Sequence, residues 1–155
     1  MNITFRKAVL HDLDILRSIN FSSFEANAAY DPHIDMSWVH SDAATTYFTD
    51  AILGDDHFVM LALSDKEPAG YIILEPKVIS YRTIKTIEIG IIAVLPEYRS
   101  SGIGSALVAE AKTWATERGY DTMFVNSYIR NEKAIDFYKK QGFSPIDISL
   151  ELELK

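Results

Sequence analysis

A short turn rich in glycine and serine is the stretch of this sequence whose residues most clearly suit a chemical role. The turn spans Arg99–Ser105, follows an apolar run that ends at Pro96, and leads into a helical pattern. Free backbone N–H groups at the start of a helix, together with the helix dipole, are well suited to holding a phosphate. Gly102 and Gly104 permit close approach of the backbone, and Arg99 adds a guanidinium that matches phosphate oxygens. From spacing alone, an ordinary tight connection between a strand and a helix explains the turn equally well.

The turn lacks two common nucleotide-binding motifs. The motif G-x-G-x-x-G of dinucleotide-binding folds is absent, because Leu107 stands three residues after Gly104. The phosphate-binding loop G-x-x-x-x-G-K-[ST] is absent as well. A phosphate site at this turn would therefore belong to another class of ligand.

A second stretch with chemical potential is Asn131–Phe143, NEKAIDFYKKQGF. On a helix over this stretch, the side chains of Ala134, Ile135 and Tyr138 share one face because they lie three and four residues apart. Tyr138 is thus expected near the core, with a hydroxyl that needs a partner. A half-buried packing tyrosine is the alternative interpretation, and Asn131 suits the N-cap of the helix.

Together the two stretches resemble the GCN5-related N-acetyltransferase (GNAT) superfamily, whose members are acetyl-CoA-dependent N-acyltransferases. The family motif [Q/R]-x-x-G-x-[G/A] is matched by Arg99, Gly102 and Gly104, directly after the step Pro96-Glu97-Tyr98. The resemblance is specific over residues 83–143 and concerns only the order of elements before that. A second family motif, N-x-x-A-x-x-[F/L]-Y-x-x-x-G-F, is matched at Asn131, Ala134, Phe137, Tyr138, Gly142 and Phe143.

The resemblance implies a site for acetyl-CoA between two splayed parallel strands, Thr83–Leu95 and Asp121–Ser127. In this family the pantetheine amides pair with exposed strand backbone, and the pyrophosphate rests on N–H groups of the turn. The family implies no metal. The residues that would hold the cosubstrate are Ile92, Ala93, Val94, Arg99, Ser100, Ser101, Gly102, Ile103, Gly104, Ser105 and Asn131.

The resemblance also implies the reaction, which is direct attack of a primary amine on the thioester. Tyr138 matches the family position that commonly protonates the departing thiolate, and a backbone N–H near Ile92 would polarise the thioester carbonyl. Glu88 is the candidate base, directly or through a water, because it is the only acidic side chain within Ile87–Leu95. An exposed or ion-paired strand glutamate is the alternative, and some family members have no dedicated base.

Two other functions stay open on the sequence alone. One is a domain that binds acyl-CoA without catalysis, as a sensor or an interaction module, and the presence of Glu88, Asn131 and Tyr138 counts against it. The other is a phosphate-binding domain for a different nucleotide. An acetyl-transfer assay with a panel of amines separates the enzyme from the sensor.

The acceptor amine is expected against residues 22–40, the stretch Glu75–Tyr81 and the C-terminal strand. Acidic side chains there would attract an ammonium group, although each alone is typical of a surface. The acceptor is a small molecule, a peptide N-terminus or a lysine, and the sequence does not choose between these or define an acyl-chain preference. The candidate walls of the acceptor site are Tyr30, His33, Trp38 and Tyr81.

Strands and helices in the order β-α-α-β-β-β-α-β-α-β, which is also the order of the family, must position these residues. We expect one α/β domain over residues 1–155 with a mixed sheet, in which the middle strands pair antiparallel and the unit 83–127 forms a parallel pair. Along Ile87–Leu95, the side chains of Ile87 and every second residue after it are expected on one apolar face. Residues 22–40 are expected as a loop with short helical turns. The expected strands are 2–9, His57–Leu63, Ala69–Leu74, Thr83–Leu95, Asp121–Ser127 and Phe143–Leu154, and the expected helices are one capped by Asp12, Ser41–Leu53, Gly102–Arg118 and Asn131–Gln141.

Composition limits the classes of function. The 155 residues are 48% apolar, and the net charge of −7 argues against nucleic-acid and anionic-membrane partners and mildly favours a cationic one. The chain has no cysteine, its four histidines lack metal-ligand spacing, and no apolar run reaches the roughly 18 residues of a membrane span. A cytoplasmic location is the default expectation. The last strand is expected either inside the sheet of its own chain or paired across a homodimer, and the sequence does not choose between the two.

Overall fold

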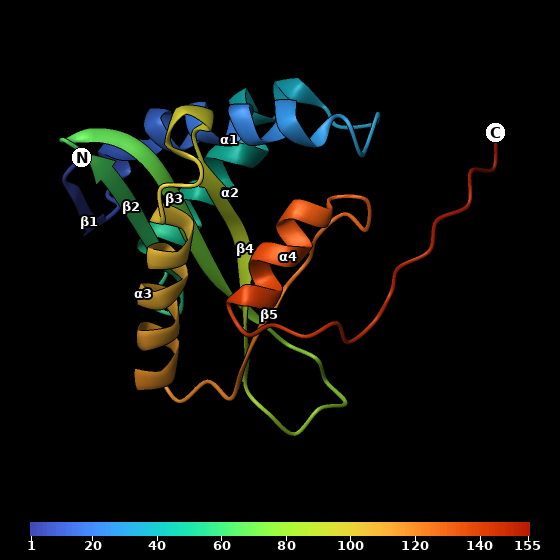
Figure 1. Cartoon of the computed structure of the whole chain (residues 1–155). Coiled ribbons are helices and arrows are strands. Elements are labelled where there is room, and N and C mark those ends of the chain that lie inside the picture. Colours follow the sequence, from blue (N-terminus) through green and yellow to red (C-terminus); the bar gives the residue numbers. More distant parts are fainter.

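The computed structural model describes all 155 residues, which form a five-stranded sheet with helices on both faces (Figure 1). The strands are β1 (Ile3–Lys7), β2 (Phe58–Ser64), β3 (Glu67–Lys77), β4 (Thr86–Val94) and β5 (Thr122–Val125). The helices are α1 (Leu13–Asn27), α2 (Asp42–Leu53), α3 (Ile103–Glu117) and α4 (Glu132–Lys140). Three short 3-10 helices are η1 (Leu10–Asp12), η2 (Met36–His40) and η3 (Pro96–Tyr98).

The five strands lie side by side in chain order, from β1 to β5. Strands β1 to β4 pair antiparallel with their neighbours, and β4 pairs parallel with β5. A parallel pair needs a long crossover, which α3 supplies, whereas the hairpin β2–β3 needs only a tight turn. The mixed α/β fold expected from the sequence is therefore confirmed.

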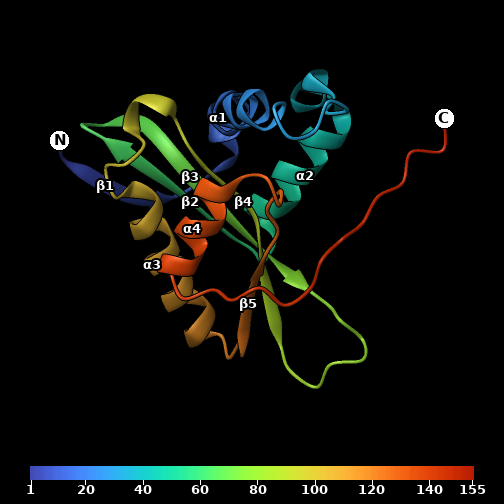
Figure 2. The same ribbon diagram turned by 45° about the vertical axis from the view of Figure 1, so that its right-hand side comes forward.

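Side chains along β3 alternate between two hydrophobic clusters, one on each face of the sheet. Ile72 and Leu74 belong to the cluster beneath α3, and Tyr71 and Ile73 belong to the cluster beneath α1 and α2. Figure 2 shows α3 on one face and α1 and α2 on the other, while α4 lies in front of β5. The sheet is thus buried on both faces over its central strands.

A β-bulge interrupts this alternation in β4. Ile73 pairs with Ile91 and the next residue of β3, Leu74, pairs with Ile89, so Gly90 is the extra residue. An extra residue moves every later side chain to the opposite face. Ile89 accordingly packs in the α3 cluster, whereas Ile91 packs against the cluster of α1 and α2. The predicted single apolar face along Ile87–Leu95 is therefore wrong.

Two elements extend further than the sequence pattern indicated. Helix α1 continues to Asn27, through residues expected as loop, and Phe24 near its end packs 5.9 Å from the Trp38 ring. Strand β3 continues through Pro76 to Lys77. Since β2 pairs with β3 only as far as Leu74, the missing N–H of Pro76 falls where β3 has one neighbour, a place where a strand tolerates proline.

The predicted last strand, Phe143–Leu154, is absent from the sheet. Residues 144–155 carry no helix or strand and run away from the body of the molecule (Figures 1 and 2). Their alternating pattern supplies an apolar face, but they pair with none of the five strands of the sheet. The order of elements therefore ends at α4.

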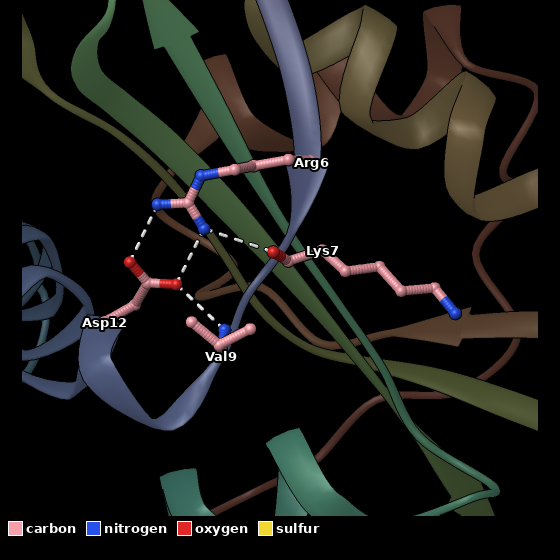
Figure 3. A network of polar contacts seen from close by, with 4 residues as sticks. All are labelled: Arg6, Lys7, Val9 and Asp12. Carbon is pink, nitrogen blue, oxygen red and sulfur yellow. Dashed lines mark hydrogen bonds and ion pairs between the residues drawn. The ribbon is translucent and has the colours of Figure 1, made fainter.

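Asp12 joins β1 to the start of α1 instead of capping the helix. Its carboxylate accepts hydrogen bonds from Nη1 and Nη2 of Arg6, both at 2.8 Å, and from the backbone N–H of Val9 at 2.8 Å (Figure 3). The Arg6 guanidinium is the main reason why the pKa of Asp12 lies below its usual value of 3.8. The side chain of Asp12 is only 5% exposed, so the charge depends on these partners.

The substitution Asp12→Asn is expected to lower the free energy of unfolding by about 1–3 kcal/mol at pH 7, because it leaves donors of Arg6 and Val9 without a charged acceptor. A carboxyl whose folded pKa is lowered stabilises the fold above its unfolded pKa and loses this effect as the pH falls through the folded pKa. The difference between wild type and variant should therefore shrink below about pH 4. Urea unfolding from pH 7 to 3 measures it, with the exposed Asp14→Asn as control. An equal difference at both ends would contradict this role.

Candidate functional site

The parallel strands β4 and β5 separate immediately before the bulge. Their pairing ends at Ile89 and Val125, whereas β4 continues to Val94. Beyond Gly90, β4 is paired with β3 on one side, and no strand lies along its other side. The stretch Ile91–Val94 thus offers backbone N–H and C=O groups along an open edge. This stretch contains the Ile92, Ala93 and Val94 backbone that the sequence assigned to pantetheine.

The turn after β4 presents a row of free donors. None of the backbone N–H groups of residues 100–105 donates a hydrogen bond within the protein. Ser100 and Gly102 have positive φ values of 61° and 88°, which turn the chain sharply before α3. A Cβ on Gly102 would meet no atom within 4 Å, so the space in front of this turn is open. The turn is therefore shaped and equipped to hold an anion.

The other residues assigned to this turn have further contacts. Arg99 is exposed and its Nε donates to the Val94 carbonyl at 3.1 Å, which ties the turn to the end of β4. The hydroxyl of Ser101 donates to the Tyr98 carbonyl. Ile103 is buried in the α3 cluster, so only its backbone can face a ligand.

Gly104 and Ser105 hold α4 against the start of α3. A Cβ on Gly104 would lie 3.3 Å from the ring of Phe137, a tighter contact than side chains usually make. The hydroxyl of Ser105 accepts a hydrogen bond from Nε2 of Gln141 at 2.9 Å. A side chain at the second glycine of the motif would therefore press against α4, independently of any ligand.

Helix α4 begins with a side-chain cap and carries Tyr138. The side chain of Asn131 accepts a hydrogen bond from the Ala134 N–H at 3.2 Å, which confirms the predicted N-cap. The Tyr138 ring packs edge-on against Phe137 and Phe143, with centroids 5.3 and 5.7 Å apart. Burial raises the pKa of Tyr138 to about 12, and its hydroxyl makes no hydrogen bond within the protein. Tyr138 is thus a protonated phenol with a free donor at neutral pH.

Two carboxylates lie opposite each other on β3 and β4, on the face covered by α1 and α2. Glu75 and Glu88 are cross-strand partners. Glu88 Oε2 lies 3.3 Å from Lys77 Nζ, and Lys77 Nζ lies 4.1 Å from the centroid of the Phe124 ring on β5. Glu88 is therefore ion-paired, which was the alternative to its role as a base. Only Oε2 takes part in the ion pair, so its second oxygen, Oε1, is free.

Sequence reasoning placed the stretch Glu75–Tyr81 at the acceptor site but did not single out the Glu75 side chain, because the expected strand ended at Leu74. Its Oε2 accepts a hydrogen bond from the Tyr47 hydroxyl at 2.9 Å. A Cβ on Gly90 would lie 2.7 Å from that hydroxyl and 2.8 Å from the Glu75 carboxylate. Burial and the nearby Glu75 charge raise the pKa of Tyr47. Glu75 and Tyr47 thus lie directly at the bulge. The antiparallel register, which pairs Glu75 with Glu88, could have identified Glu75 as a neighbour of the candidate base.

The structure brings one of the four predicted acceptor walls close to these carboxylates. The Trp38 ring lies 6.1 Å from the ring of Tyr47, the hydrogen-bond partner of Glu75. Tyr30 stacks on Tyr128 at 6.0 Å, in the loop between β5 and α4.

The other two predicted walls lie on the surface. His33 is exposed, and its Nε2 lies 3.6 Å from Oε1 of Glu153. Tyr81 is 89% exposed, in the loop 78–85 between β3 and β4, which Figures 1 and 2 place at the opposite end of the sheet from the turn 99–105. The structure therefore does not gather the four residues into one wall.

No group of three or more His, Cys, Asp and Glu side chains lies where it could hold a metal ion. No helix combines the length and the apolar character that a bilayer span requires.

Comparison with known proteins points to one family. The family model described as "Acetyltransferase (GNAT) family" matches residues 17–143. An uncharacterized N-acetyltransferase of Methanocaldococcus jannaschii is 27% identical over 146 residues, which are 94% of this chain and 62% of that protein. The amino-acid acetyltransferase of Proteus mirabilis is 34% identical over 68 residues, which are 44% of this chain and 14% of that protein. The chain thus spans less than two thirds of the length of these curated relatives.

Solved structures share the fold over the whole chain. A mutant protein of Bacillus halodurans superposes with a TM-score of 0.83 at 19% identity, covering 98% of this chain and 99% of that one. AAC(6')-Iy in complex with the bisubstrate analog CoA-S-monomethyl-acetylneamine superposes with a TM-score of 0.75 at 17% identity, covering 100% of this chain and 99% of that one.

Proposed function

Because the chain belongs to the acetyltransferase (GNAT) family, we propose that it transfers an acetyl group from acetyl-CoA to a primary amine. The observation that carries this proposal is the row of free N–H groups at residues 100–105, which directly follows the open edge of β4. The row holds the pyrophosphate, and Ile92, Ala93 and Val94 pair with the pantetheine amides. The open space in front of Gly102 leaves room for such a group. AAC(6')-Iy, which shares the fold, is a protein bound to a coenzyme A analog.

The proposed reaction forms a bond between the amine nitrogen and the acyl carbon and breaks the carbon–sulfur bond. The amine must lose a proton before or during attack, and the departing thiolate must gain one. A backbone N–H near Ile92 polarises the thioester carbonyl. Tyr138 donates the proton to the thiolate, since its hydroxyl is free and its raised pKa of about 12 keeps it protonated at neutral pH.

Glu88 and Glu75 divide the work on the acceptor amine. Glu88 takes the proton of the ammonium, directly or through a water, while Lys77 holds one of its oxygens. Glu75, held by Tyr47, adds a second negative charge on the same face and binds the ammonium. Trp38 flanks this pair on the side of α2. Two carboxylates beside an aromatic ring favour a cationic acceptor.

The function is tested with purified protein, acetyl-CoA and a panel of amines that includes amino acids, aminoglycosides, polyamines, and peptides with a free N-terminus or a lysine. Release of free thiol that depends on one amine class is the expected result. Binding of acetyl-CoA without thiol release for any amine would support the non-catalytic sensor instead. Tighter binding of ATP or NAD than of coenzyme A would overturn the proposal.

Tyr138→Phe is expected to lower kcat by about 100-fold and to leave the affinity for acetyl-CoA nearly unchanged, because only the proton donor is removed. Steady-state kinetics and calorimetric titration with coenzyme A measure the two effects. Tyr120→Phe removes a phenolic hydroxyl away from the site and serves as the matched control. A Tyr138→Phe enzyme with wild-type kcat would exclude Tyr138 as the acid.

Glu88→Gln and Glu75→Gln are expected to affect different kinetic constants. Loss of the base in Glu88→Gln should lower kcat by about 100-fold. Loss of the ammonium-binding charge should raise the KM of the amine by about 10-fold with a smaller change in kcat. Glu117→Gln, near the end of α3, controls for loss of charge alone. A kcat loss larger for Glu75→Gln than for Glu88→Gln would reverse the two roles.

A further inference from the structure

Four residues, which we call the latch, join the end of α1 to the loop that precedes α4. The Tyr128 hydroxyl donates to Oδ2 of Asp31 at 3.0 Å. Nη2 of Arg130 donates to the backbone carbonyl of Tyr30 at 3.0 Å. The rings of Tyr30 and Tyr128 stack with their centroids 6.0 Å apart. Three contacts of different kinds thus join segments that lie 97 to 100 residues apart in the chain.

The α1 side of the latch is fixed to the core. α1 packs against β3 and β4 through buried side chains. The backbone N–H groups of Tyr30 and Asp31 both donate to the Asn27 carbonyl, so the two residues continue directly from the helix. The His33 N–H donates to Oδ1 of Asp31 at 2.9 Å. This bond and the Tyr128 hydroxyl hold the pKa of Asp31 below its usual value of 3.8, so the carboxylate is charged at neutral pH.

Helix α4 contains no buried residue, so the contacts at its two ends matter more for its position. Its C-terminal end is attached to α3, where Nε2 of Gln141 donates to the Ser105 hydroxyl at 2.9 Å and Phe137 packs against the α3 cluster. Its N-terminal end follows the latch directly. The N–H of Asn131, the cap of α4, donates to the Tyr128 carbonyl at 2.9 Å. The latch therefore holds the end of α4 that α3 does not hold.

The latch joins elements on the two sides of the open edge of β4. α1 packs on the β3 and β4 side of that edge, whereas residues 126–131 follow β5 on its other side. Figures 1 and 2 both show the chain after α1 beside the chain that leads into α4. Tyr138 lies about two turns, or roughly 10 Å, past the Asn131 cap. A shift of the latched end of α4 is therefore passed on to the Tyr138 side chain.

We propose that the latch positions Tyr138 for proton donation, so that its four members are positioning residues of the acetyl transfer. This inference rests on the proposed function, in which the Tyr138 hydroxyl must reach the departing sulfur. A helix attached at one end can pivot, and a misplacement of about 1 Å can cost about 100-fold in rate. α1 also covers the sheet face that carries Glu75 and Glu88. The latch thus fixes the acid on α4 relative to the two carboxylates across the open edge.

The kinetic test combines Tyr128→Ala with Arg130→Met, which removes all three latch contacts. The double variant should lower kcat by about 10- to 100-fold and leave the affinity for coenzyme A nearly unchanged. In a Tyr138→Phe background the same two substitutions should change kcat by less than about twofold, because the group that the latch positions is already absent. Tyr128→Phe alone keeps the stacked ring and should lower kcat by less than about threefold. Arg82→Met, in the exposed loop 78–85, controls for loss of a guanidinium alone.

Hydrogen exchange tests the latch without turnover. Amides of residues 135–140 should exchange at least about 10-fold faster in the double variant, whereas amides of α3 should keep their rates. If no amine is acetylated, the proposed function fails, and the exchange rates still decide whether the latch holds α4. Circular dichroism checks that the variants are folded, and Arg130→Met alone replaces the double variant if that one is not.

Three results would overturn the inference. An equal fall of kcat in the wild-type and Tyr138→Phe backgrounds would show that the latch acts on another step. A higher KM of the amine with an unchanged kcat would make Tyr30 and Asp31 part of the acceptor site only. Unchanged exchange in α4 would show that the contacts with α3 hold the helix by themselves.

Discussion

The β-bulge at Gly90 is the constraint on which the arrangement of the site depends. The extra residue ends the parallel pairing of β4 with β5 at Ile89 and changes the face on which later side chains lie. Before Gly90, β4 is a buried internal strand with an acidic side chain, Glu88, on one face. After Gly90, Ile91–Val94 is an open edge that leads directly into the turn 99–105. One irregular residue therefore separates a polar region, suited to an amine, from a backbone edge suited to an extended ligand.

Glycine at this position leaves room for the polar groups around it. A Cβ would overlap both the Tyr47 hydroxyl and the Glu75 carboxylate, so these side chains would have to shift if Gly90 were replaced. Two carboxylates facing each other across a strand pair repel, and each here has its own compensating partner. Lys77 contacts Glu88 and the hydroxyl of Tyr47 contacts Glu75. The partners leave acceptor capacity on both carboxylates, because each contact engages one oxygen.

Local features of the site could be predicted from the sequence, and features set by register could not. The cap at Asn131 and the sharp turn at Gly102 depend on a few consecutive residues, and both are visible in the motifs. Family membership followed from the same motifs and is confirmed. The bulge leaves no mark in the alternation of β4, because isoleucines stand on both sides of Gly90. The position of Glu75 opposite Glu88 depends on that register, so its place in the site was also hidden.

The tail shows a different limit of sequence reasoning. Its alternating pattern is typical of a strand face, yet a pattern cannot say whether an edge of the sheet accepts it, and in this structure none does. The outer strand β5 instead contributes to the site, since Phe124 of β5 lies under the Lys77 ammonium that contacts Glu88.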